Sequence, residues 1–179
     1  MLFGDAGEDD IIGNGGNDRL FGGADDDRLR GSGNDDTLFG QAGDDRLEGG
    51  AGVDDLRGSA GDDILLGGTG GDRLDGQAGN DTLNGGADGN RDTFVFAVDY
   101  DQDRINGFEQ TGNDRIEIDN ALWEGNSNIT GRQSVIDEFG TLNAPGTILT
   151  LDFGNGDILE IQNAAGIDAS TFGNDLLIV

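Results

Sequence analysis

The chain has 179 residues, with 35 glycines, 37 acidic residues and 10 basic residues, and its formal net charge is −27. This charge argues against nucleic acid as a partner and favours a divalent cation as counterion. Cysteine and histidine are absent, which excludes disulfides, thiolate or imidazole metal ligands and histidine-based catalysis. No apolar run approaches the roughly 18 residues of a membrane span, and no Sec-type signal opens the sequence.

The composition changes near residue 90. Residues 1–90 hold 25 of the 35 glycines, and only 17 of these 90 residues are Leu, Ile, Val or Phe. So low an apolar content is typical of segments that do not fold unaided. Residues 91–179 contain 27 such residues in 89, an ordinary globular proportion. The sequence therefore predicts two domains, 1–91 and 92–179.

A nine-residue repeat runs through the first domain. Each repeat opens with a glycine, has an aspartate five residues later, and a branched aliphatic two residues after that. The fourth position is glycine in most repeats, and Asp25 or Asn34 in two of them. Asp and Asn are the non-glycine residues that best tolerate a left-handed backbone. The opening glycines are Gly4, Gly13, Gly22, Gly31, Gly40, Gly49, Gly58, Gly67, Gly76 and Gly85.

Each part of the repeat has a physical role. The first six residues predict a turn, in which glycines permit positive φ and direct backbone carbonyls toward a common centre. The aspartate adds a carboxylate oxygen, and calcium prefers six to eight oxygen ligands at about 2.3–2.6 Å. The last three residues predict a short strand with the aliphatic side chain inside. Two repeats, or 18 residues, therefore form one coil.

Stacking at a period of 18 predicts calcium between the aspartates of adjacent coils. One edge runs from Asp9 to Asp81 and the other from Asp18 to Asp72, which gives seven internal sites, and Asp92 could complete an eighth. We therefore expect about seven or eight Ca²⁺ ions, with backbone carbonyls near the opening glycines as further ligands. The predicted side-chain ligands are Asp9, Asp18, Asp27, Asp36, Asp45, Asp54, Asp63, Asp72, Asp81 and Asp92.

The repeats resemble the RTX (hemolysin-type calcium-binding) family, whose pattern is G-G-x-G-x-D-x-U-x. The resemblance covers about half of the chain and implies an all-β fold, a right-handed parallel β-roll with calcium in its turns. Extracellular modules of this sort bind calcium at about 10⁻⁴–10⁻³ M. Because metal binding then contributes folding free energy, we expect the chain to be unfolded in calcium-poor cytosol and folded outside the cell.

The second domain is expected to be a β-rich cap on the repeat stack. Its alternating pattern predicts strands at 93–98, 114–119, 147–153 and 157–162, and 120–124 could form a helical turn. Asp99, Asp101 and Asp103 resemble the start of an EF-hand loop, but Arg104 and Gln110 stand where that loop needs Gly and Glu. We therefore reject an EF-hand, while one further metal contact in this segment remains open.

Two segments of this domain are similar to the C-terminal region of serralysin-type and related type I secreted proteins. They are Asp92–Phe96 and the stretch from Asp103 to Ile116. The last five residues, Asp175–Val179, are similar to the uncleaved C-terminal signal of ABC-exporter substrates, although a plain final strand would look the same. The resemblance implies an ABC-type exporter as partner and a secreted, extracellular bacterial location.

Residues 18 apart also form columns on the outer faces of the sheets. Phe3, Phe21 and Phe39 are expected to stack, with Arg57 next in the column. Outward arginines have acidic neighbours in register, such as Arg30 beside Glu48 and Arg73 beside Asp55, which predicts cross-strand ion pairs. This pairing favours a structural role for the arginines over a grip on an acidic polysaccharide.

The leading functional hypothesis is a calcium-binding module that supports the folding and secretion of a larger exported protein. The chain starts in mid-repeat at Leu2 and Phe3, which indicates an upstream domain as a further partner. The alternative is a glycan-binding accessory module, like those of alginate epimerases, or an adhesin segment. Neither H-E-x-x-H nor G-x-S-x-G occurs, and the regularly spaced acids are expected to bind metal. We therefore expect no enzymatic activity.

Overall fold

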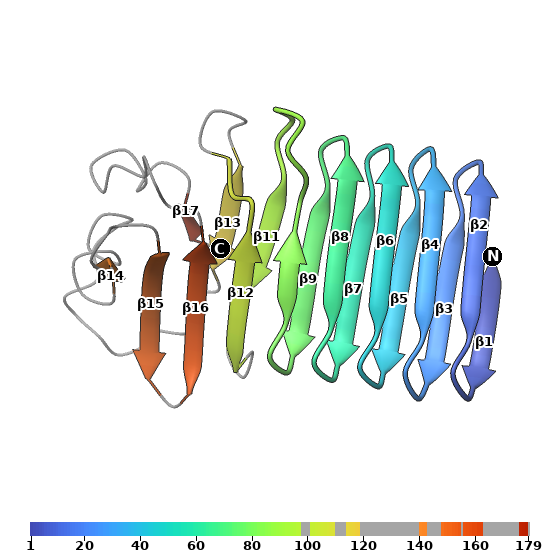
Figure 1. The fold of residues 1–179 in the computed structure, drawn as a ribbon, viewed down its shortest axis with the longest axis horizontal. Coiled ribbons are helices and arrows are strands. Elements are labelled where there is room, and N and C mark those ends of the chain that lie inside the picture. The colour runs from blue at the N-terminus through green and yellow to red at the C-terminus, as the bar shows by residue number, and fades with distance from the viewer. Residues whose placement is uncertain are drawn as a thin grey trace.

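The computed structural model describes residues 1–97, 101–109, 114–118, 140–142, 148–154, 156–162 and 176–178. These residues form strands, and none of them lies in a helix (Figure 1). The part described also has no helix that could cross a membrane. The strands are β1 Leu2–Ala6, β2 Asp10–Gly15, β3 Arg19–Ala24, β4 Arg28–Gly33, β5 Thr37–Ala42, β6 Arg46–Ala51, β7 Asp55–Ala60, β8 Ile64–Thr69, β9 Arg73–Ala78, β10 Thr82–Asn84, β11 Thr93–Phe96, β12 Gln102–Asn106, β13 Arg115–Ile118, β14 Gly140–Leu142, β15 Ile148–Gly154, β16 Asp157–Gln162 and β17 Leu176–Ile178.

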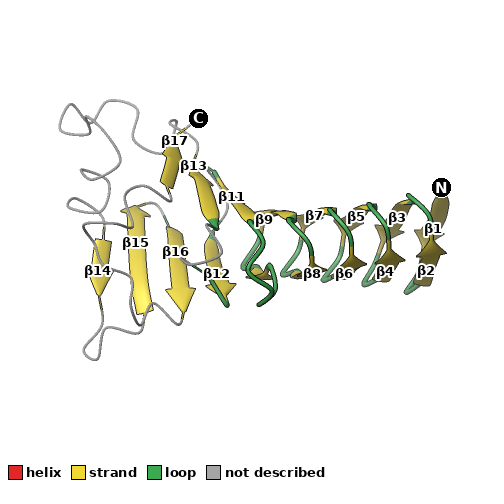
Figure 2. Cartoon of the chain, turned by 90° about the horizontal axis from the view of Figure 1, so that it is seen from above, coloured by secondary structure: helices red, strands yellow, loops and turns green. Residues whose placement is uncertain are grey.

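From β1 to β13, successive strands alternate between two sheets that face each other, as Figure 2 shows. One sheet has the order β1-β3-β5-β7-β9-β11-β13-β17, and the other β14-β15-β16-β12-β10-β8-β6-β4-β2. Pairing is parallel throughout except between β14 and β15 and between β15 and β16. In the repeats the paired residues are 18 apart, as in Leu20 with Leu38. The predicted all-β parallel β-roll and its period of 18 are therefore confirmed.

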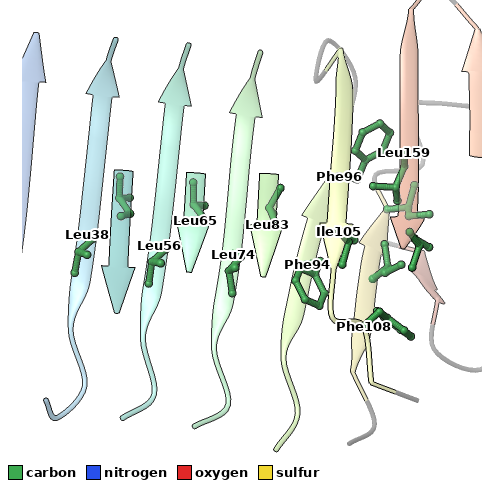
Figure 3. Close-up of a cluster of buried hydrophobic side chains, with 14 of the residues drawn as sticks. Leu38, Leu56, Leu65, Leu74, Leu83, Phe94, Phe96, Ile105, Phe108 and Leu159 are labelled. Atoms are coloured by element: carbon green, nitrogen blue, oxygen red, sulfur yellow. The ribbon is translucent and has the colours of Figure 1, made fainter. Parts of the chain in front are cut away.

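A ladder of aliphatic side chains fills the space between the two sheets. The aliphatic residue of every repeat is buried, and from Leu20 to Leu83 its exposure does not exceed 1%. Each repeat strand from β3 to β8 has two buried positions, the aliphatic residue and the opening glycine. The aliphatic side chains therefore form one ladder along the coils (Figure 3). Burying one such side chain contributes about 1.5–3 kcal/mol. The ladder therefore gives the roll its only continuous apolar core among the described repeats.

The two sheets continue past the last repeat. β11 pairs with β9, β12 with β10, and β13 with β11, all in parallel. Phe94 takes the register position of Leu74, and Phe96 adds a second buried side chain on the same strand. The rings of Phe96 and Phe153 have centroids 5.5 Å apart. The strands expected at 93–98, 114–119, 147–153 and 157–162 correspond to β11, β13, β15 and β16. The helical turn expected at 120–124 lies outside the described residues.

Two positions of each turn adopt positive φ. The fourth position does so in the nine complete repeats, including Asp25 at 76° and Asn34 at 73°, as their residue types predicted. The second position does so as well, and there the side chains are more varied, with Gln41 at 89° and Ser59 at 96°. The opening glycines do not adopt positive φ. Glycine therefore recurs at the first position of each repeat for another reason.

Candidate calcium sites

The repeat aspartates form two columns, one along each edge of the roll. In both columns the Oδ1 atom of an aspartate accepts a hydrogen bond from the backbone N–H of the aspartate one coil earlier, at 2.7–3.0 Å. The first column is Asp9, Asp27, Asp45, Asp63, Asp81 and Asp103; the second column is Asp18, Asp36, Asp54, Asp72, Asp92 and Asp114. All ten predicted ligands therefore lie in the two columns.

The second oxygen of most of these carboxylates is buried and has no hydrogen-bond donor. A buried polar atom without a partner is costly, and a buried charge more so. The exposed fraction of the aspartates from Asp27 to Asp81 is only 1–4%, so water cannot supply the missing interaction. The affected atoms are the Oδ2 atoms of Asp9, Asp27, Asp36, Asp45, Asp54, Asp63, Asp72, Asp81 and Asp103.

The opening glycines explain where these oxygens point. An added Cβ on Gly22 would lie 2.4 Å from Oδ2 of Asp27 and 2.6 Å from the carbonyl oxygen of Gly40 in the next coil. The same arrangement recurs at the other opening glycines up to Gly67. Both oxygens lie where that Cβ would be, so no side chain fits at this position. The opening residue must be glycine because of this close approach.

The donor set fits calcium. Carboxylate and carbonyl oxygens are the ligands that Ca²⁺ prefers. Within the described ranges no group of three or more acidic side chains converges on one point. Each site would therefore need the backbone carbonyls of the turns beside the carboxylates of its column.

Burial also changes the protonation of the columns. It raises the pKa of Asp63 to about 8, with the charges of Asp81 and Asp45 adding to the effect. Burial likewise raises the pKa of Asp72 to about 7. Near neutral pH, these side chains must therefore be protonated or neutralised by a cation for the coils to stack.

Asp103 and Asp114 are the members of the columns that the repeat pattern did not predict. Asp103 is 22 residues from Asp81, and Asp114 is 22 from Asp92, because the loops between these strands are longer. A local signal was available. Both aspartates are followed by Arg-Ile, which matches the Asp-Arg-Leu of the repeat at Asp72.

The outer faces partly follow the predicted pairing. Arg30 forms the expected ion pair with Glu48, at 3.0 Å. The pair expected between Arg73 and Asp55 is wrong: Arg73 reaches Glu117 at 2.7 Å, and Asp55 pairs with Arg57 on its own strand at 2.8 Å.

The aromatic column forms as expected on the outer face of the first sheet. The ring centroids of Phe3 and Phe21 are 4.9 Å apart, and so are those of Phe21 and Phe39. The guanidinium of Arg57 lies 5.4 Å from the centroid of the Phe39 ring.

Comparison with known proteins identifies the repeats. A family model of the RTX calcium-binding nonapeptide repeat matches residues 3–38, 21–56, 30–65 and 57–91. The chain belongs to this RTX calcium-binding family, and calcium is the cation that its repeats bind. No curated protein matches the chain.

Two solved structures resemble the chain. One is the extracellular lipase LipA from Serratia marcescens, with a TM-score of 0.45 and 18% identity over 93% of this chain and 40% of the lipase. The other is the AlgE6R3 subunit from the Azotobacter vinelandii mannuronan C5-epimerase, with a TM-score of 0.37 and 23% identity over 86% of this chain and 78% of that one. This chain therefore spans less than half the length of the lipase.

A pair of glycine substitutions within one turn tests the close approach. Gly31→Ala would place a Cβ 2.4 Å from Oδ2 of Asp36 and 2.7 Å from the carbonyl oxygen of Gly49. We expect it to destabilise the calcium-loaded roll by about 1–3 kcal/mol. Gly33→Ala is the control, because its nearest contact would be 3.9 Å away. The measurement is denaturant unfolding in saturating calcium, and equal loss of stability in both variants would contradict the proposed packing.

Acidification should favour the roll when calcium is absent. Asp63 has an ordinary pKa of 3.8, and in the fold its pKa rises to about 8. The folded chain therefore holds more protons than the unfolded chain between about pH 4 and pH 8. The stability of the metal-free fold is greatest below this window and falls as the pH rises through it. In chelator, the β signal in circular dichroism should grow from pH 8 to pH 5, with sedimentation as the control for aggregation. Growth with rising pH would contradict this account.

Proposed function

We propose that this chain is a calcium-dependent folding module of an exported bacterial protein. It would stay unfolded in calcium-poor cytosol and form the β-roll in extracellular calcium. The observation that carries this proposal is the set of buried Oδ2 atoms without donors. A chain that buries such a series of ionised carboxylates needs a cation in order to fold.

Calcium would supply the positive charge between adjacent coils. Two carboxylates about 4 Å apart repel by about 1 kcal/mol in water and by more when partly buried. The glycine-rich backbone adds a further ordering cost. We assign seven ions to the gaps between repeat aspartates and an eighth to the gap between Asp72 and Asp92. Their binding free energy becomes folding free energy.

We further propose that the chain has no reaction of its own and acts as a part of a longer protein. Its column carboxylates are assigned to metal, which leaves them unsuited to acid–base chemistry. Similarity of the segment from Asp103 to Ile116 to type I secreted proteins supports an ABC-type exporter as partner. An upstream domain is the second proposed partner. Of the proposed signal at residues 175–179, only 176–178 lie within the described residues.

The central test is a calcium titration followed by far-UV circular dichroism. We expect a cooperative gain of β signal at about 10⁻⁴–10⁻³ M calcium, reversed by chelator. Equimolar magnesium is the control, and it should not reproduce the gain, because Mg²⁺ demands near-octahedral geometry and keeps its waters. A chain with the full β signal in chelator at neutral pH would overturn the proposal.

A second candidate function rests on the exposed aromatic column. Phe3 is 60% exposed, and the guanidinium of Arg19 lies within 5.9 Å of the ring centroids of Phe21 and Phe39. Stacked rings beside a cation could contact the sugars of an acidic polysaccharide.

Chromatography on immobilised alginate in calcium distinguishes the two functions. A folding module should pass unretained, whereas a glycan-binding module should be retained and should lose retention in Phe21→Ala. Thr37→Ala on the neighbouring strand is the control for general effects on that sheet. Retention of the parent chain would move the assignment to glycan binding.

A further inference from the structure

The two aspartate columns end differently beyond the repeats. The family model stops at residue 91, while each column continues by one aspartate, Asp103 in the first and Asp114 in the second. In both, Oδ1 accepts a hydrogen bond from the backbone N–H of the preceding aspartate in the column, at 3.0 Å. The two aspartates differ in the partner of the other carboxylate oxygen, Oδ2.

The second column ends on hydrogen-bond donors. Oδ2 of Asp114 accepts the backbone N–H of Glu109 at 2.7 Å, and the N–H of Asp114 donates to the carbonyl of Glu109 at 3.2 Å. Both carboxylate oxygens of Asp114 therefore have partners from the backbone. A cation at this position would have to displace the hydrogen bond from Glu109.

The first column ends on an oxygen without a donor. Asp103 is 2% exposed, and its Oδ2 atom is buried with no partner, like that of Asp81 in the coil before. Arg104 does not neutralise it, because the guanidinium of Arg104 pairs with Glu160 at 3.2 Å. The pair Asp81 and Asp103 thus reproduces the arrangement of the aspartate pairs inside the repeats.

A cavity lies beside this pair. Its volume is about 290 Å³, and its lining includes Asn80, Asp81, Gln102 and Asp103. The lining therefore includes two buried aspartates and two exposed amide residues, and carboxylate and amide oxygens are ligands of the kind that calcium prefers.

We propose that the first column binds one calcium ion beyond the repeats, between Asp81 and Asp103, and that the second column has no such ion between Asp92 and Asp114. The inference rests on the proposed function and extends it. The added ion would join β10 to β12. Since β12 pairs with β16, and β16 with β15, this ion would attach the C-terminal strands to the roll.

Native mass spectrometry of the full chain in calcium tests the proposal by counting bound ions. Asp103→Asn keeps a side-chain carbonyl that can accept the hydrogen bond from the backbone N–H of Asp81, but it loses the negative charge. This variant should bind one ion fewer than the parent chain. Asp114→Asn is the matched variant at the end of the other column and should bind the same number as the parent. Asp45→Asn, inside the repeats, should lose at least one ion.

The outcomes distinguish failure of the added site from failure of the proposed function. If Asp45→Asn loses an ion while Asp103→Asn loses none, the added site is overturned and the calcium module stands. Loss of an ion in Asp114→Asn would overturn the difference between the columns. If none of the variants loses an ion, the proposed function itself fails.

A second measurement covers a variant that does not fold. Circular dichroism in calcium shows whether Asp103→Asn reaches the β signal of the parent chain. If it does not, anomalous diffraction from crystals of the parent chain grown in calcium shows whether an ion binds beside Asp103. A calcium peak at about 2.3–2.6 Å from Oδ2 of Asp103 supports the site, and no peak there overturns it.

Discussion

A buried carboxylate repeated in every coil connects the main features of this fold. One of its oxygens accepts a hydrogen bond from a backbone N–H of the coil before, as Asp45 does from Asp27 at 2.8 Å. In nine of the twelve column aspartates the other oxygen is buried without a donor. The first oxygen joins adjacent coils, and we propose that the second makes this junction depend on a cation. In this proposal, the stacking of coils and the binding of calcium are coupled.

Other features follow from this carboxylate. The opening residue is glycine because the carboxylate oxygen and the carbonyl of the next coil occupy the place of a Cβ. The apolar core is a single leucine ladder, whose burial is opposed by the backbone entropy of a glycine-rich chain. In the proposed function, calcium offsets both the stacked charge and this ordering cost, so that a module of this composition would fold after export.

Much of the fold and of the site could be predicted from the sequence. The period of nine, with Leu and Asp at constant positions, was enough to predict the coil of 18 residues, the buried ladder and the columns from Asp9 to Asp92. Asp103 and Asp114 were missed because longer loops change the spacing to 22, which sequence periodicity cannot follow. The partner of Arg73 was missed for a related reason: Glu117 is 44 residues away and becomes a neighbour only after β11 and β13 are placed.

Hydrogen exchange at single amides tests most directly whether the cation holds the coils together. The N–H groups of Asp27, Asp45 and Asp63 donate to the carboxylates of the next coil, so their exchange reports on each junction. At neutral pH, the account predicts strong protection of these amides in calcium and exchange at the rate of an unfolded chain in chelator. Protection that persists in chelator would contradict it, because the coils would then stack without a cation.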